Sequence, residues 1–101
     1  MDDKGLYAGL MRLHILHHAA EKVVCGVWVM EELRRHGYEI SSGTLYPMLH
    51  GLERKGYLTS TKERVGKTIR RLYSITPEGK TALSEAKAKV HELFGELLEA
   101  P

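Results

Sequence analysis

The feature that most restricts the fold of this chain is a heptad pattern near its C-terminal end. It follows Thr76-Pro77-Glu78-Gly79, where Thr suits a helix N-cap, Pro the first helical position and Glu the positive helix end. The apolar seam and its flanking aromatic comprise Leu83, Ala86, Val90, Leu93, Phe94 and Leu97. A helix of about 20 residues extends roughly 30 Å, which is farther than so small a domain can cover. We therefore expect this helix to pack partly on a second copy of the chain.

A second amphipathic pattern occupies residues 41–56. Ser41 suits the N-cap and Gly56 suits the helix end. Pro47 leaves two starts open, one at Ser41 with the proline in the second turn, and one nearer Thr44 with the proline in the first. The apolar stripe comprises Leu45, Met48, Leu49 and Leu52. The opposite face offers hydrogen-bond donors at Thr44, Tyr46, His50, Arg54 and Lys55.

Two further helices are predicted before this one, over residues 5–20 and 26–36, with a β-prone link at residues 23–25. We expect Glu31, Glu32, Arg34 and Arg35 to form the solvated face of the second helix, with Glu31 and Arg35 as an ion pair. The apolar stripes expected to be buried are Leu6, Leu10, Leu13 and Leu16 or His17 in the first helix, widened by Met11 and Ile15, and Val27, Met30 and Leu33 in the second.

Two strand-like runs, residues 57–63 and 68–75, flank a link that contains Gly66 and therefore predict a β-hairpin. The order of elements predicts a mainly α fold with a small β-hairpin. Residues 1–76 would form a winged helix-turn-helix, and residues 77–101 would add a long dimerisation helix, in one compact unit. In such folds the second helix of the pair enters the DNA major groove, and the hairpin, or wing, reaches the backbone or the minor groove.

The distribution of charge supports the same reading. The whole chain carries a net charge of only +2. Residues 50–71 contain seven Lys or Arg and two Glu, a net charge of +5, whereas the segments before and after carry −1 and −2. The basic residues of the predicted wing are Lys62, Arg64, Lys67, Arg70 and Arg71. Positive charge confined to one segment is typical of a surface that contacts phosphate, so we expect double-stranded DNA as a partner.

Composition excludes several other classes of protein. One cysteine permits neither an internal disulfide nor a four-cysteine zinc site. No apolar run approaches the roughly 18 residues of a membrane span, and the acidic start Met-Asp-Asp-Lys-Gly lacks the charge pattern of a signal peptide. We expect a cytoplasmic protein without membrane contact. No catalytic motif is present, so neither enzymatic activity nor a cofactor is predicted.

Four potential metal ligands lie close together in the sequence. His14, His17 and His18 share the first predicted helix, and Cys25 follows it. Imidazole and thiolate suit zinc, copper or nickel, so a metal-responsive regulator that uses His14, His18 and Cys25 is one alternative. The other interpretation places His17 against the core and the remaining histidines in solvent or at the partner's last helix.

Two segments carry a resemblance to a known family. The sequence GTLYPMLHGLERKGYL (residues 43–58) followed by RRLYSITPEG (residues 70–79) resembles the PadR family of transcriptional regulators. The resemblance implies an N-terminal winged helix, a C-terminal dimerisation helix and dimeric repressors that bind palindromic operators. It also implies that the DNA-facing helix includes Ser42, Thr44, Tyr46 and His50, and that the wing contains Arg64, Lys67, Arg70 and Arg71.

Together these observations predict a homodimeric, sequence-specific DNA-binding regulator that acts as a repressor. The resemblance further implies a small aromatic or drug-like effector near the dimer interface, although the last helix has only Phe94 as an aromatic residue. The main alternative is a winged-helix module that binds another protein and has lost specific DNA binding.

Overall fold

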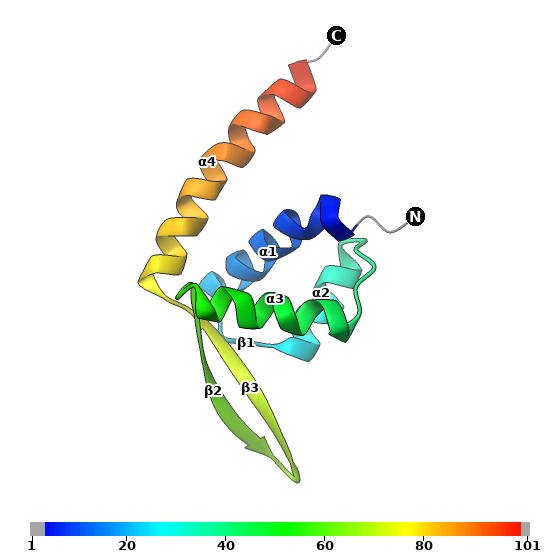
Figure 1. The fold of residues 1–101 in the computed structure, drawn as a ribbon, viewed down its shortest axis with the longest axis vertical. Helices are drawn as coiled ribbons and strands as arrows, with labels where there is room; N and C mark the ends of the chain where they lie inside the picture. Colours follow the sequence, from blue (N-terminus) through cyan, green and yellow to red (C-terminus); the bar gives the residue numbers. More distant parts are fainter. Residues whose placement is uncertain (1–3, 100–101) are drawn as a thin grey trace.

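A computed structural model describes residues 4–99 of the chain (Figure 1). Residues 1–3 of the acidic N-terminal start and the last two residues of the predicted dimerisation helix lie outside the described residues. Four helices and three strands follow in the order α1 (Lys4–Glu21), β1 (Val24–Cys25), α2 (Gly26–Arg35), α3 (Ser42–Arg54), β2 (Leu58–Val65), β3 (Thr68–Ile75) and α4 (Pro77–Glu99) within that range. The predicted fold class, mainly helical with a small β-hairpin, is confirmed.

The sheet joins the hairpin to the helices. Its strands are antiparallel in the order β1-β3-β2, so that Val24 pairs with Tyr73 and Leu58 pairs with Ile75. Tyr73 and Leu58 are buried at the base of the sheet, whereas the hairpin tip projects away from the helices (Figure 1). The core therefore lies between α1, α2, α3, the start of α4 and the base of the sheet. Its buried members include Met11, Ile15, Leu16, Val29, Leu33, Leu45, Leu49, Leu52 and Leu83.

Helix α3 matches its prediction closely. All four residues of its expected apolar stripe are buried. The helix begins at Ser42, so the earlier of the two starts is correct and Pro47 lies within the helix. The proline is solvent-exposed, and it has no N–H to donate to the carbonyl of Gly43, four residues earlier. Ser41 is the N-cap residue by its extended backbone, but its side chain makes no capping hydrogen bond.

The predicted stripes of α1 and α2 are partly wrong. Leu6 is 73% exposed and Leu10 is 44% exposed, whereas Met11, Ile15, Leu16 and Ala19 are buried. His17 is exposed, so the alternative that placed it against the core is wrong. This helix is apolar on more than one side, so periodicity alone cannot select the side that meets the core. In α2 the buried stripe passes through Val29 and not through Val27.

The predicted solvated face of α2 is also wrong at Glu32, which is only 9% exposed. Its carboxylate accepts a hydrogen bond of 2.6 Å from Nε of Arg35 and forms an ion pair with the same guanidinium. The ion pair of α2 therefore joins residues three apart, in place of the predicted pair between Glu31 and Arg35. A charge buried in this way requires such a partner.

Helix α4 begins as the sequence predicts. The Thr76 hydroxyl accepts a hydrogen bond of 2.9 Å from the backbone N–H of Gly79 and donates one to the Gly56 carbonyl. A Cβ added at Gly79 would lie 2.2 Å from the Tyr57 carbonyl oxygen, so only glycine permits this approach. Beyond the buried Leu83 the helix extends past the body of the domain (Figure 1). No helix among residues 4–99 combines the length and apolar character that crossing a membrane requires.

Candidate nucleic-acid interface

The exposed side of α3 holds most of the polar residues that the sequence assigned to it. Ser42, His50, Arg54 and Lys55 are exposed, and Thr44 is half-buried. Below this side, the apolar stripe of the helix packs into the core, so the helix cannot turn its polar side elsewhere without exposing its leucines. The fold thus presents a short helix with a row of hydrogen-bond donors to solvent, which is the shape a DNA major groove accepts.

Tyr46 occupies a different environment from the other polar residues of α3. It is half-buried, and its ring and hydroxyl lie against the backbone of Gly26 at the start of α2. A Cβ added at Gly26 would lie 2.7 Å from both Cε1 and the hydroxyl oxygen of Tyr46. Tyr46 therefore helps to pack α3 on α2. Side-chain periodicity placed it on the polar face but could not reveal this contact.

The hairpin separates its basic residues onto two faces. Lys62 lies directly opposite Arg71, and Arg64 lies opposite Ile69. Side chains alternate across a strand, so Lys62, Arg64 and Arg71 share the face whose base contains Ser60. Ser60 donates a hydrogen bond of 2.8 Å to the Glu53 carboxylate near the end of α3. The face that bears these three cations is therefore the face of the hairpin that adjoins α3.

Arg70 lies on the opposite face. Its guanidinium donates a hydrogen bond of 3.0 Å to the Glu63 carboxylate and also approaches Sγ of Cys25 at 3.8 Å. The hydrogen bond and charge of Glu63 raise the pKa of Arg70. The sequence placed Arg70 together with the other wing cations, but strand register and its carboxylate partner set it apart from them.

The turn of the hairpin is shorter than the predicted link. Arg64 and Val65 belong to β2, and the turn consists of Gly66 and Lys67. Gly66 has φ of +61°, and no residue other than glycine has positive φ in the described part of the chain. Positive φ at the first turn residue alone is the sign pattern of a type II′ hairpin turn. Lys67 is consequently held at the outermost point of the wing, exposed to solvent.

The potential metal ligands are rearranged relative to the sequence-based hypothesis. Cys25 lies in the sheet beside Arg70. His14 and His18 approach His36, which follows α2, and these three side chains can bring ligand atoms within 4.8 Å of one another. The hypothetical grouping of His14, His18 and Cys25 is therefore wrong at Cys25. His36 could not be found from sequence because it is 18 residues farther along the chain than His18.

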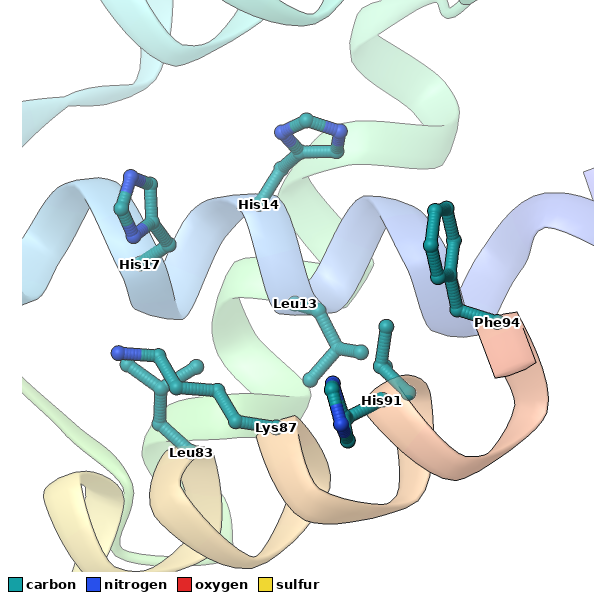
Figure 2. Close-up of a pocket in the computed structure, with 8 residues that line it drawn as sticks. Leu13, His14, His17, Leu83, Lys87, His91 and Phe94 are labelled. Atoms are coloured by element: carbon teal, nitrogen blue, oxygen red, sulfur yellow. The ribbon is translucent and has the colours of Figure 1, made fainter.

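The residues predicted for a dimer interface fall into two sets along α4. Leu83 is buried within its own chain and Ala86 is half-buried. The remaining four have exposed fractions of 42–65%: Val90, Leu93, Phe94 and Leu97. An open groove of about 440 Å³ runs between α1 and α4, with Leu13 and Val90 among its lining residues (Figure 2).

The helices and hairpin together define a winged helix-turn-helix. In this class the second helix of the pair is called the recognition helix and the hairpin the wing, and α3 and the β2–β3 hairpin occupy these positions. Residues 15–85 match the transcriptional regulator PadR-like family. Over 88 residues the chain is 51% identical to the transcriptional regulator Rv3488 of Mycobacterium tuberculosis. The match covers 87% of this chain and 82% of that protein.

Solved structures agree with the sequence match. A PadR family transcriptional regulator from Eggerthella lenta has a TM-score of 0.82 at 33% identity, covering 96% of this chain and 88% of that one. A transcriptional regulator from Clostridium thermocellum has a TM-score of 0.79 at 28% identity, covering 93% and 94%. The chain belongs to the PadR-like family of transcriptional regulators, which confirms the resemblance carried by residues 43–58 and 70–79.

Proposed function

We propose that this transcriptional regulator is a homodimeric repressor that binds a palindromic operator, with α3 in the major groove and the wing on the phosphate backbone. Residues 1–76 would bind DNA and residues 77–101 would dimerise. The observation that supports this most strongly is the cross-strand pair of Lys62 and Arg71. Like charges directly opposite each other destabilise a sheet, so their placement is best explained by an anionic partner that binds between them.

The surroundings of this pair favour phosphate as that partner. Lys62, Arg64 and Lys67 form no ion pair with any residue in the described part of the chain, and all three are exposed. Arg71 donates a hydrogen bond of 3.2 Å to Ser60, which holds it toward the α3 side. Each Lys or Arg that neutralises a phosphate contributes about −0.9 to the slope of log K against log salt.

A second copy of the chain would cover the exposed apolar surface. The outer half of α4 presents Leu93, Phe94 and Leu97, and the outer side of α1 presents Leu6 and Leu10. Of these side chains, Phe94 lines the groove between α1 and α4. A heptad helix from a partner would bury both sets at once. The resulting two-fold symmetry would place two α3 helices in successive major grooves, about 34–36 Å apart.

The decisive experiment is DNA binding measured at several salt concentrations. Labelled fragments of the DNA surrounding the gene would be titrated with the full chain and followed by fluorescence anisotropy. We expect one fragment with an inverted repeat to bind tightly, with a steep inverse dependence on salt. Equal affinity for all fragments with a shallow slope would contradict the proposal and favour the protein-interaction module.

The dimer is tested separately by light scattering at micromolar concentration. The expected mass is twice the 11.4 kDa of one chain. Leu97→Lys places a charge on the exposed apolar face and should shift the mass toward that of one chain. Lys80→Glu, at an exposed position near the start of α4, is the matched control. A wild-type mass of one chain would refute the dimer.

A further inference from the structure

Three imidazoles from two helices converge at the junction of α1 and α2. His14 and His18 lie one turn apart on α1, and His36 follows the last turn of α2. The rings of His14 and His36 are stacked with centroids 4.7 Å apart, and those of His18 and His36 lie 6.1 Å apart. One nitrogen from each ring can be chosen so that all three lie within 4.8 Å of one another.

The cluster is partly enclosed. The edge of Trp28 meets the ring of His18 at a centroid distance of 5.3 Å, and Tyr38 meets His14 at 5.4 Å. The side chain of His18 is only 13% exposed. Its Nε2 is buried and has no hydrogen-bond partner. Buried polar atoms almost always have a binding partner. We therefore expect this nitrogen to bind a group that comes from outside the protein.

Carboxylates flank the cluster on two sides. Oε1 of Glu21 lies 3.6 Å from Nδ1 of His18, on the opposite side of the ring from the unpartnered Nε2. Oε1 of Glu32 lies 3.9 Å from Nε2 of His36. A carboxylate behind a ligating histidine orients the ring and strengthens it as a ligand. Both acids are thus placed where an outer shell of a metal site requires them.

The side chains of His14 and His18 favour the neutral imidazole, which is the form that binds metals. Burial is the main cause that lowers the pKa of His14 and of His18 below the ordinary value of 6.5. Neighbouring histidines lower both further, while Glu32 opposes the shift. At neutral pH these rings are consequently neutral, and a neutral imidazole is a metal ligand whereas an imidazolium is not.

We propose that His14, His18 and His36 form a binding site for a divalent transition metal, with zinc as the ion that fits best. Three imidazoles leave the fourth position of a tetrahedral zinc to water. Zinc–nitrogen bonds of about 2.1 Å place ligand nitrogens about 3.4 Å apart. Rotation of the side chains must therefore draw the nitrogens together by about 1.4 Å at most.

A second group of potential ligands, His17, His18 and Glu21, is the weaker choice. It lies on one helix, and His17 and Glu21 are exposed. In Figure 2 the rings of His14 and His17 both point away from α4.

The group of His14, His18 and His36 has the advantage that it joins two helices. A metal there would clamp α1, which borders the predicted dimer surface, to α2, on which α3 packs. We expect this clamp to change the affinity for DNA. That expectation rests on the proposed function, whereas metal binding itself does not.

The site is tested by calorimetric titration of the full, tag-free chain with zinc chloride, after treatment with a chelator. Cobalt serves as a second probe, because its absorption spectrum reports coordination by nitrogen. We expect one metal per chain. His36→Ala, at an exposed position, should reduce affinity by more than 100-fold. Glu21→Gln, in the outer shell, should reduce it about 10- to 100-fold.

Three variants serve as controls. Cys25→Ser, His17→Ala and His91→Ala each remove a potential ligand outside the proposed set and should leave zinc affinity unchanged. Circular dichroism would establish that every variant is folded. The proposal fails if the wild-type chain binds no zinc, or if binding survives His36→Ala but is lost in His17→Ala or Cys25→Ser. Metal binding without any change in DNA affinity would overturn the coupling and leave the site intact.

Discussion

The wing and the junction of α1 and α2 both gather nitrogen-bearing side chains, but under opposite conditions. In the wing, the cationic side chains of Lys62 and Arg71 are exposed to solvent. At the junction, His14 and His18 are partly enclosed by aromatic rings, and burial lowers their pKa values. Permanent exposed charge suits an extended polyanion, whereas neutral, converging lone pairs suit a single small cation. Residue type and solvent access together separate the two regions.

The largest expected effect comes from removing the charges on one face of the wing, which tests the contrast between the wing and the junction. Lys62→Ala with Arg71→Ala deletes four cations from a dimer, and should weaken operator binding on the order of a thousand-fold at 0.1 M salt. Arg70→Ala, on the opposite face and paired with Glu63, should change affinity by only a small factor. Fluorescence anisotropy measures both. A larger loss for Arg70→Ala would mean that the wrong face has been assigned to DNA.

Zinc should stabilise the fold through the junction alone. At a free zinc concentration 100 times the dissociation constant, the free energy of unfolding should rise by about 2.7 kcal/mol. Chemical denaturation with and without zinc measures this increment. The double variant of the wing should show the full increment and His36→Ala should show none. If the rise in the free energy of unfolding with zinc were lost in the double variant of the wing, the distinction between the wing and the junction would be wrong.

Tyr46 tests whether solvent exposure decides how much a residue of α3 contributes to stability, because it belongs to that helix yet packs on Gly26. Tyr46→Ala should lower the free energy of unfolding by about 2 kcal/mol, since a half-buried ring is lost. His50→Ala, one helical turn later and exposed, should change it by less than about 0.5 kcal/mol. Urea denaturation compares them. Equal effects would show that Tyr46 contributes only at the surface.

Acidification should give the smallest effect and should act only at the junction. The unfolded chain protonates His14 and His18 near pH 6.5, whereas the lowered pKa values delay protonation in the folded, metal-free protein. The unfolded state therefore binds more protons in this window, and stability present above pH 6.5 is lost as the pH falls through it. His17, His36, Glu21 and Glu32 face the two rings and modulate the loss.

Thermal melts of chelated protein between pH 7.5 and pH 5.5 measure this dependence. Replacing His14 and His18 with Gln should flatten it. The double variant of the wing should retain it, because lysine and arginine do not titrate in this range. A dependence that survives the histidine replacements would place its source elsewhere in the chain.

Sequence periodicity succeeded where one side of a helix is clearly apolar. The stripe of α3 is separated from its polar face without ambiguity, and the caps around Thr76 and Gly56 are local signals that do not depend on distant residues. The strand runs and the turn at Gly66 are local in the same sense. For these reasons the winged helix could be predicted from the sequence, apart from the exact length of the hairpin turn.

The sequence by itself determined the order of elements, the concentration of positive charge in α3 and the wing, and the apolar seam of α4. Tertiary structure alone decided which side of α1 is buried, which face of the hairpin each cation occupies and that Tyr46 packs on Gly26. It also brought His36 to His14 and His18 in place of Cys25. The reason is physical: periodicity and capping act within a few residues, whereas burial, cross-strand register and ligand convergence depend on segments that meet only after the chain has folded.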